Sequence, residues 1–514
     1  MGPLLLGIDA GTTAVKVHVI DATGSSLVQT SQRLDYIHTA DNGIEFDPEA
    51  LWQQTLVAVK DALGQLENPR DVTAIASVGV GESGVLVDED GNAICHSLAW
   101  YDERPVAQMQ QLVERYGEDY LARRSGMRVT PIAGLCKLMW MRDHHAEALA
   151  GAKHWLAVSD YIAFRLCGVA ATDFSLAGRT LVLDLVKACW DTDMLREQHI
   201  PVHLMPPLVD NGVPLGVIRT EISDSLGLSE DCTIVLGGHD HVVGALACGV
   251  FDNDVLMDSL GTAEALLLPT KKMIEDDVPP SYGVEQGMLR IAGEPLYFVL
   301  GGLNAGSASV EWFRKELADE ADYDEICSAA NDVVPGANGV LFVPHLRGLS
   351  PPQSQAGSHG AFLNIGTWTD RPHLFRAVLE GLAFDARKVA ECMAGLVGRQ
   401  SLPKRIFITG GSSQNELLMR LKAHVFGRTL DVLTLPQSVS LGAALLAGIG
   451  AGVFSHWREA VERVGASVFP VPPDAEQIAF YQSRYECNYL PTVNCLQPLV
   501  DLQTSNKKIS ANSR

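Results

Sequence analysis

Short apolar runs separated by turn residues open the chain. Residues 4–9 and 14–20 are apolar runs, and a third β-rich stretch covers residues 26–36. Runs of this length, bounded by Gly, Asp, Asn and Thr, are typical of β-strands. The pattern predicts a β-meander whose first turn carries Asp9 and Gly11.

Helical spacing begins after this meander. Asp47-Pro48-Glu49 precedes apolar residues that recur at helical spacing up to Leu63, and proline and acids are favoured in a first helical turn. The small apolar runs at 74–80 and 233–238 predict buried strands. Residues 85–92 predict a strand followed by a hairpin turn, because Asp-Gly-Asn is a strong turn sequence.

The pattern predicts a mainly helical region from residue 105 to 200, with Trp140, Trp155 and Trp190 as core candidates. A second β-rich block at 254–268 again joins two apolar strands by a turn containing Gly and Thr. This echo of the opening block suggests two related domains that face one another.

The last third repeats the strand, glycine turn and helix pattern. A strand at 404–409 runs into Gly410-Gly411 and then into a helix with hydroxyl and amide residues at its start. The helix predicted at 440–450 consists of small residues, which lets another element pack very close to it. Residues 500–514 are polar and lack apolar periodicity, which predicts a disordered tail.

Length and charge limit the classes of function. A chain of 514 residues is too long for one core, so we expect two or three domains. With 39 Lys and Arg against 62 Asp and Glu, a nucleic-acid partner is not expected. No run of about 20 apolar residues predicts a membrane span, and the start of the chain lacks the pattern of a signal peptide. The ten cysteines show no C-x-x-C pair and read as reduced thiols, so we expect a cytoplasmic protein.

The first turn has the chemistry of a phosphate-binding hairpin. Gly11 lets the backbone approach a ligand closely, and Thr12 and Thr13 supply hydroxyl and N–H groups to phosphate oxygens. Asp9 at the strand end can hold a hydrated Mg²⁺ that bridges those oxygens. The alternative is an ordinary hairpin with a glycine turn.

Asp240 is the candidate catalytic residue. It follows the buried strand at 233–238 directly, which places it where the carboxyl end of a strand opens into a crevice. A carboxylate there can accept the proton of an alcohol as the alcohol attacks a phosphoryl group. The alternative is that Asp240 only caps the following helix. His239 and His241 flank it, and we interpret both as structural residues rather than metal ligands.

Taken in order, these segments resemble the FGGY family of carbohydrate kinases over about residues 4–490. Residues 362–381 resemble the second signature of the family, and Lys137-Leu138-Met139-Trp140 the core of the first. The resemblance implies an α/β fold of two ribonuclease-H-like domains, of the actin, hexokinase and 70-kDa heat-shock ATPase type, around a central cleft. It implies a sugar-binding domain at 1–249 and a nucleotide-binding domain at 250–495.

The same resemblance implies ATP and Mg²⁺ as cofactors and a role for each matching residue. Asp240 would be the general base and Asp9 the residue that holds Mg²⁺ through water. The residues implied on the sugar side are Glu82, Ser83, Trp100, Asp102 and Asp240. Those implied on the nucleotide side are Asp9, Thr12, Thr13, Lys16, Gly261, Thr262, Gly301, Gly410, Gly411 and Asn415. For Glu82, a solvated acid in a turn is the alternative.

The substrate is less constrained than the reaction. The Gly-His-Asp sequence around Asp240 and the run at 84–92 look closer to fuculokinase-like members, whereas Asn364, Gln437 and the run at 345–348 depart from common family residues. The departure at 345–348 weakens any borrowed specificity. The resemblance implies phosphorylation of a ketopentose or deoxy-ketohexose, such as a xylulose- or fuculose-like sugar.

Three alternatives and one question of assembly remain open at this point. A linear polyol or sugar acid, such as erythritol, glycerol or gluconate, is the alternative kinase substrate. A hinge ATPase that phosphorylates no sugar is the competing class, although it does not explain Asp240 on its Gly-Gly-His turn. A glycoside hydrolase that uses Asp9 and Asp240 as its acid pair leaves the Gly-Thr loops unexplained. A homodimer is left open.

Overall fold

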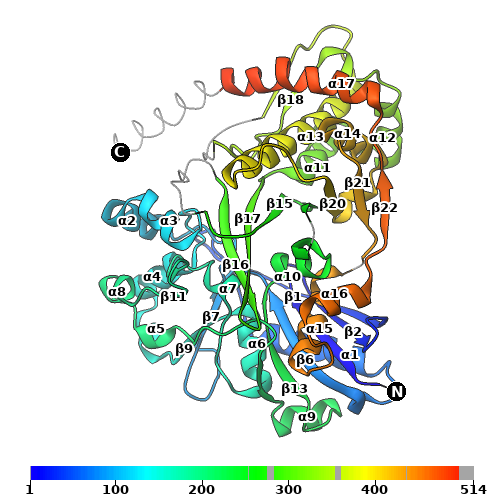
Figure 1. The fold of residues 1–514 in the computed structure, drawn as a ribbon. Helices are drawn as coiled ribbons and strands as arrows, with labels where there is room; N and C mark the ends of the chain where they lie inside the picture. Colours follow the sequence, from blue (N-terminus) through cyan, green and yellow to red (C-terminus); the bar gives the residue numbers. More distant parts are fainter. Residues whose placement is uncertain (1, 253, 275–282, 354–359, 436, 497–514) are drawn as a thin grey trace.

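Two mixed β-sheets, one in each half of the chain, form the centre of the molecule, and helices cover them (Figure 1). The computed structural model describes residues 2–252, 254–274, 283–353, 360–435 and 437–496. The tail predicted at 500–514 therefore lies outside the described residues. The predicted boundary between residues 249 and 250 falls between helix α10 and strand β14.

The N-terminal sheet has the strand order β12-β13-β6-β1-β2-β3. Strand β1 is antiparallel to β2 and parallel to β6, and β6 is parallel to β13. The carboxyl ends of β1, β6 and β13 therefore meet at one edge of the sheet. The strands are β1 (Leu4–Ala10), β2 (Ala14–Asp21), β3 (Ser26–Arg33), β6 (Val72–Gly79), β12 (Pro214–Val217) and β13 (Thr233–His239).

The C-terminal sheet has the order β16-β17-β15-β14-β20-β21-β22. Its central strands β14, β20 and β21 are parallel, while β15, β16 and β17 form an antiparallel meander. The strands are β14 (Val255–Leu260), β15 (Glu264–Thr270), β16 (Glu285–Ile291), β17 (Glu294–Leu303), β20 (Arg405–Thr409), β21 (Leu430–Leu433) and β22 (Val468–Val471).

Two helices lie between the sheets and join the halves. Helix α10 (Asp240–Ala247) packs against α15 (Ser438–Gly450), and α15 also packs on β1 and β6 of the N-terminal sheet. A Cβ atom on Gly7 of β1 would lie 1.9 Å from the carbonyl oxygen of Ser440. The small residues of α15 and Gly7 thus allow backbone-to-backbone contact, which confirms the prediction of close packing for this helix.

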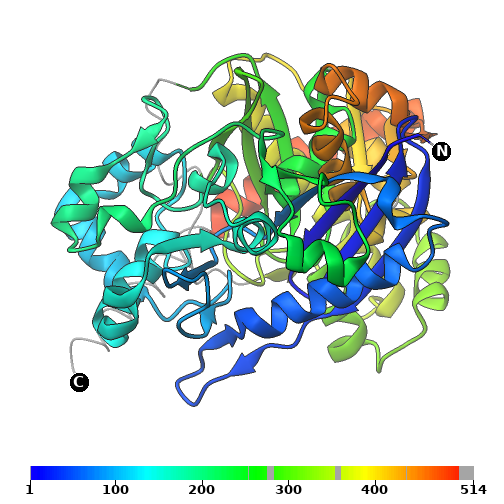
Figure 2. The same cartoon turned by 90° about the horizontal axis from the view of Figure 1, so that it is seen from below.

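The remaining elements flank the sheets. Helix α1 (Pro48–Leu63) begins where predicted, is capped by Asp47 and lies along β2 and β3 (Figure 2). Helix α6 (Val158–Cys167) packs on β6 and β13. The other helices of the N-terminal half are α2 (Val106–Tyr116), α3 (Glu118–Ser125), α4 (Gly134–His144), α5 (Ala146–Gly151), α7 (Phe174–Ala177), α8 (Thr192–Glu197) and α9 (Thr220–Leu226). Those of the C-terminal half are α11 (Gly306–Leu317), α12 (Tyr323–Asn331), α13 (Arg371–Leu396), α14 (Glu416–Phe426), α16 (Trp457–Val464) and α17 (Ala475–Arg484).

Short strands complete the fold. They are β4 (Ile37–His38), β5 (Ile44–Phe46), β7 (Gly84–Val87), β8 (Ser97–Leu98), β9 (His154–Ala157), β10 (Leu183–Asp184), β11 (Cys189–Trp190), β18 (Leu341–Val343) and β19 (Ala361–Leu363). The turn after β7 forms, but β7 pairs along its length with the distant β9, which carries Trp155. Trp190 is only half-buried. Within the described ranges, no helix combines the length and apolar character needed to cross a bilayer.

Candidate active site

A cleft of about 370 Å³ lies between the two halves of the molecule. Among the residues predicted to form the site, those that line it are Thr12, Glu82, Trp100, Asp240 and Gly301. Thr12, Glu82 and Asp240 follow β1, β6 and β13 at the edge where these three strands end. Trp100 lies in the loop after the short strand β8, and Gly301 lies on β17 of the C-terminal sheet. The parallel arrangement of three strands therefore brings together residues that are far apart in sequence.

Asp240 begins helix α10 on the N-terminal side of the cleft. Its carboxylate accepts a hydrogen bond from the backbone N–H of His241 over 2.5 Å, and a quarter of its side chain remains exposed. Burial and the nearby Asp9 carboxylate raise the pKa of Asp240 to about 8. A carboxyl group with this pKa can take up and release a proton close to neutral pH, as a general base must.

Asp9 lies at the end of β1, opposite Lys16 on β2, with 3.7 Å between its carboxylate and the lysine Nζ. Burial raises the pKa of Asp9 to about 6, and Lys16 opposes that rise. The Oδ1 atom of Asp9 is buried without a hydrogen-bond partner. A buried carboxylate oxygen left unpaired at a strand end fits a hydrated divalent cation, because Mg²⁺ prefers oxygen ligands and retains waters.

The turn after Asp9 is held from two sides. The backbone N–H of Gly11 donates to the carbonyl of Ala14 over 3.1 Å, and that of Leu34 to the carbonyl of Thr13 over 2.9 Å. The Thr12 hydroxyl accepts a hydrogen bond from the indole N–H of Trp100, also over 2.9 Å. The predicted phosphate turn is thus joined to the loop that carries Trp100.

A chain of four charged side chains crosses the cleft, and sequence reasoning identified only one of them. Arg179 donates to Glu82 and to Glu285, each over 2.6 Å, and Arg128 pairs with Glu285 at 3.4 Å. The two guanidinium groups hold the pKa of Glu285 down at about 2. Glu285 lies on β16, so this chain connects the two halves, and Glu82 is a buried, paired acid rather than a solvated one.

Two residues predicted on the sugar side are not among the described residues that line the cleft. Ser83 is buried and its hydroxyl donates to the carbonyl of Leu98 over 2.9 Å. Asp102 is buried, pairs with Arg104 and accepts the backbone N–H of Ile44 over 2.7 Å. Their assignment as sugar ligands remains a prediction.

Lys137, in the segment that resembles the first family signature, binds the backbone of the loop that carries Trp100. It is 3% exposed, and its ammonium donates to the carbonyls of Ala99 and Trp100 over 2.6 and 2.9 Å. Burial lowers the pKa of Lys137 to about 7. The residue therefore fixes the backbone of the loop that presents the Trp100 ring.

The glycine loops of the C-terminal half lie against one another. The carbonyls of Gly261 and Thr262 accept the N–H groups of Ser307 and Ala308, at 3.2 and 3.1 Å. A Cβ on Gly410 would lie 2.4 Å from the carbonyl oxygen of Leu260. The structure thus brings the turn after β14 next to the first turn of α11 and the end of β20.

The other nucleotide-side candidates have packing or capping roles in the structure. Gly301 leaves room for Met393, whose sulfur would lie 2.9 Å from a Cβ there. Gly411 opens a short turn that leads to Asn415. Asn415 caps α14 by accepting the N–H of Leu418 over 2.9 Å, and its amide donates to the Tyr323 hydroxyl over 2.8 Å. Their nucleotide-binding roles also remain predictions.

A buried ion cluster underlies the turn after β14. The ammonium of Lys422, on α14, lies 2.7 Å from Asp258 and 2.7 Å from Glu264, and all three side chains are at most 3% exposed. Burial and the neighbouring Asp258 raise the pKa of Glu264 to about 8, although Lys422 opposes the rise. The cluster connects the two strands on either side of Gly261 and Thr262, a link that sequence spacing gave no means of finding.

His239 and His241 flank Asp240 in the lining of the cleft, and both are only half-buried. Burial lowers the pKa of His241 to about 4 and that of His239 well below its ordinary value, so both are neutral. Across the described residues, no group of three or more His, Cys, Asp or Glu side chains is arranged to hold a metal ion.

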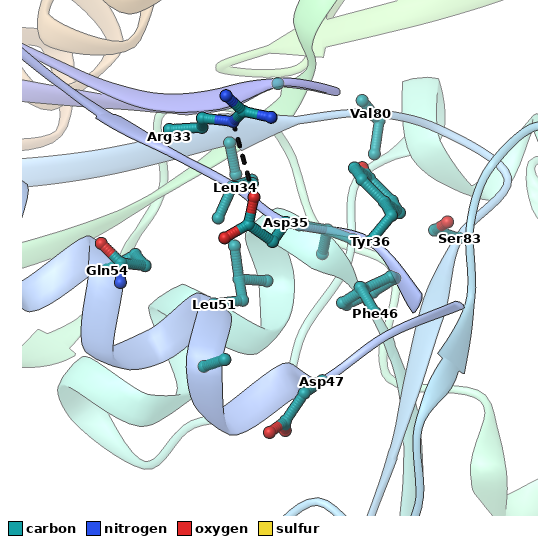
Figure 3. A pocket seen from close by; sticks show the side chains of 14 residues that line it. Arg33, Leu34, Asp35, Tyr36, Phe46, Asp47, Leu51, Gln54, Val80 and Ser83 are labelled. Atoms are coloured by element: carbon teal, nitrogen blue, oxygen red, sulfur yellow. Dashed lines mark ion pairs between the residues drawn. The ribbon is translucent and has the colours of Figure 1, made fainter. Parts of the chain in front are cut away.

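A second hollow, of about 80 Å³, lies behind the Gly11 turn (Figure 3). Its walls are mainly apolar, with Leu34, Phe46 and Leu51 pointing into it, and Arg33 pairs with Asp35 at 3.5 Å near its opening. β3 ends at Arg33, earlier than predicted, because the next residues turn away to line this hollow. The Arg33–Asp35 pair is almost fully exposed to solvent, so we place the chemistry in the larger cleft.

Comparison with known proteins agrees with this geometry. Residues 4–247 match the N-terminal domain of the FGGY family of carbohydrate kinases, and residues 256–451 match its C-terminal domain. The chain belongs to the FGGY family of carbohydrate kinases. It is therefore an ATP-dependent sugar phosphotransferase, and the expected family and reaction class are confirmed.

Several FGGY kinases are similar along nearly the whole chain. The xylulose kinase of Bacillus subtilis (strain 168) is 26% identical over 489 residues, which cover 94% of this chain and 95% of that protein. The glycerol kinase of Gloeobacter violaceus is 28% identical over 466 residues, 89% of this chain and 90% of that protein. The crystal structure of gluconate kinase from Lactobacillus acidophilus superposes with a TM-score of 0.87 at 25% identity, covering 96% of this chain and 98% of that one. The two-domain α/β fold predicted for FGGY kinases is thus confirmed.

Proposed function

We propose that this FGGY kinase transfers the γ-phosphoryl group of ATP to a hydroxyl of a neutral, xylulose-like ketose, with Asp240 as the general base. The observation that carries the proposal is Asp240 itself, a partly exposed carboxyl in the cleft with its pKa raised to about 8. In the reaction, the hydroxyl proton passes to Asp240 as the oxygen forms its bond to the γ-phosphorus, and ADP leaves.

The charges of the cleft favour a neutral substrate over a sugar acid. Among the described residues, the guanidinium groups that line it are those of Arg128 and Arg179, and both pair with carboxylates of the same cleft. Proteins usually bind a substrate carboxylate through a charge-assisted bond to such a cation. In the same cleft, Glu82 supplies instead an acceptor for hydroxyl groups, and the Trp100 ring supplies an apolar face for the C–H groups of a sugar.

The relatives support a ketose substrate but do not separate it from a polyol. Xylulose kinases and glycerol kinases are both similar to this chain, and a gluconate kinase shares its fold. Glycerol is neutral, so the charge argument does not separate it from xylulose. Turnover with each candidate decides between them.

Asp9 would hold Mg²⁺ through water, and Lys16 would lie on the same phosphates. Bound there, the cation would screen the negative charge that develops between nucleotide and acceptor. The Thr12 and Thr13 turn and the turn at Gly261 and Thr262 would surround the β- and γ-phosphates from the two sheets. Closure of the halves would exclude water, which competes with the sugar for the phosphoryl group.

The test is ADP release in a coupled assay with xylulose, ribulose, fuculose, tagatose, erythritol, glycerol and gluconate. We expect a ketose to give the highest kcat/KM and Asp240→Asn to abolish that turnover. Asp193→Asn, which changes an exposed carboxylate on helix α8, serves as the matched control and retains full activity. Faster turnover of gluconate would refute the neutral substrate, and sugar-independent ATP hydrolysis unchanged in Asp240→Asn would refute the general base.

A further inference from the structure

The strand that leads to Asp240 is irregular just before its end. In the pairing of β13 with β6, the register shifts between Leu236 and Gly238, so Gly237 is an extra residue in the ladder. A Cβ on Gly237 would lie 1.7 Å from the carbonyl oxygen of Ser77, so the bulge requires glycine there. Bulges next to active sites redirect the side chains that follow them, and here Gly238 is followed by His239 and then Asp240.

Asn211 holds this bulge. Its side-chain amide donates to the carbonyl oxygen of Gly237, which the register shift has released from the ladder. A Cβ on Gly238 would lie 2.5 Å from the same amide nitrogen, so the asparagine fills the space beside both glycines. Asn211 is 1% exposed, which gives the bond a dry, fixed environment.

The other side of Asn211 reaches the C-terminal half. Its Oδ1 accepts the backbone N–H of Arg290 over 3.2 Å, and its own backbone N–H donates to the Arg290 carbonyl over 2.7 Å. Arg290 lies on β16, the strand that also carries Glu285. Glu285 is the acid that binds Arg179 across the cleft. Strand β16 therefore contacts both Arg179 in the cleft and Asn211, which holds the turn before Asp240.

A second bond holds the same turn. The hydroxyl of Ser175 accepts the backbone N–H of His239 over 2.9 Å and donates to the buried Asp173. The two backbone groups that flank the turn, the Gly237 carbonyl and the His239 N–H, are thus each bound by a buried side chain. Neither side chain lines the cleft.

We propose that Asn211 is a positioning residue that couples the orientation of the Asp240 side chain to the position of strand β16. Ser175 holds the other end of the same turn. The inference rests on the proposed role of Asp240. When β16 is displaced from Asn211, as domain opening would do, the bulge loses its support and the carboxylate is no longer held toward the acceptor hydroxyl. Binding of substrates in the closed cleft and orientation of the base are thereby linked.

Steady-state kinetics of Asn211→Ala and Ser175→Ala, at saturating sugar and ATP, test the coupling. A displaced base costs turnover rather than binding, so we expect kcat to fall by about 10- to 100-fold while both KM values stay within about threefold. Ser175→Thr keeps the hydroxyl and should restore most of kcat. The matched control is Ser223→Ala, on helix α9. It removes a different buried serine hydroxyl, which donates to the backbone carbonyl of Thr220.

The outcomes separate the inference from the function on which it rests. Turnover in Asp240→Asn would refute the general base itself. An inactive Asp240→Asn together with a wild-type kcat in Asn211→Ala would refute only the coupling, and so would losses of kcat that match the loss of folded protein. If Asn211→Ala fails to fold, Asn211→Asp takes its place, because it keeps the acceptor for Arg290 and loses the donor to Gly237; an unchanged kcat there also overturns the coupling.

Discussion

The indole N–H of Trp100 donates a hydrogen bond to the hydroxyl of Thr12 across 2.9 Å. Thr12 belongs to the turn expected to hold phosphates, and Trp100 to the loop expected to hold the sugar. Both side chains line the cleft. The two substrates of an FGGY kinase would therefore meet at a pair of residues that are already bonded to each other.

Replacing Trp100 with Phe tests this link. The variant keeps an aromatic face but removes the N–H, so we expect kcat/KM to fall about fivefold, the value of one net hydrogen bond of about 1 kcal/mol. The effect should appear for both ATP and sugar in initial-rate measurements. Trp190→Phe is the control, because the Trp190 N–H donates to the carbonyl of Pro206 outside the cleft. Equal effects of the two variants would contradict the link.

The pH dependence of kcat/KM should report Asp240. The base acts only when deprotonated and its pKa is raised to about 8, so activity should rise as the pH increases toward 8. Lys16 lowers that pKa, and Lys16→Met should move the rising limb to higher pH. Rate profiles between pH 5.5 and 9.5 provide the measurement. A flat profile would mean that this carboxyl does not limit the rate.

Close packing at Gly7 should make the fold sensitive to a single methyl group. In Gly7→Ala the new Cβ would lie 1.9 Å from the Ser440 carbonyl oxygen, and neither backbone can move freely. We expect the free energy of unfolding to fall by about 3 kcal/mol, at the upper end of overpacking penalties. Urea denaturation measures it. Gly151→Ala, at the end of α5 with no atom within 4 Å of the new Cβ, should leave stability nearly unchanged.

Removing the cation of the buried cluster should destabilise the protein in a pH-dependent way. Lys422→Met leaves the Asp258 and Glu264 carboxylates buried without it, a loss of about 3–5 kcal/mol. The folded state already raises the pKa of Glu264 to about 8, so the folded protein binds the extra proton. Its stability therefore falls as the pH rises from about 4.5 to 8. In the variant Lys422 no longer lowers the pKa of Glu264, so the fall should continue above pH 8. Denaturation at pH 6, 8 and 9.5 measures both ranges, with Lys315→Met, at an exposed lysine, as the control.

The sequence predicted the elements that carry local patterns. The opening hairpin, the helix after Asp47 and the strand before Asp240 all form where periodicity and capping residues placed them. The position of Asp240 at a strand end also followed from the sequence, because a buried strand followed by glycines indicates an edge of a sheet. These features depend on residues only a few positions apart.

The pairings across the cleft could not be predicted in the same way. Arg179 meets Glu285 from 106 positions away, and Lys422 meets Asp258 from 164. No local pattern marks such partners, since an arginine that pairs in a cleft and one that faces solvent look alike in sequence. For the same reason nothing in the sequence indicated that Ser83 donates to the Leu98 carbonyl or that Asp102 pairs with Arg104.

The placement of α15 constrains how such kinases can be recombined. This helix belongs to the second half of the chain but covers the sheet of the first half, with Ser440 against Gly7 of β1. Its Gly442 also lies against Val243 of helix α10. A chimaera joined near residue 250 would confront each half with a foreign surface at its tightest contact. Chimaeras that exchange specificity between family members should fold more often when residues 438–450 come from the same parent as the N-terminal sheet. The segment to be exchanged is then defined by a packed interface and not by a continuous stretch of sequence.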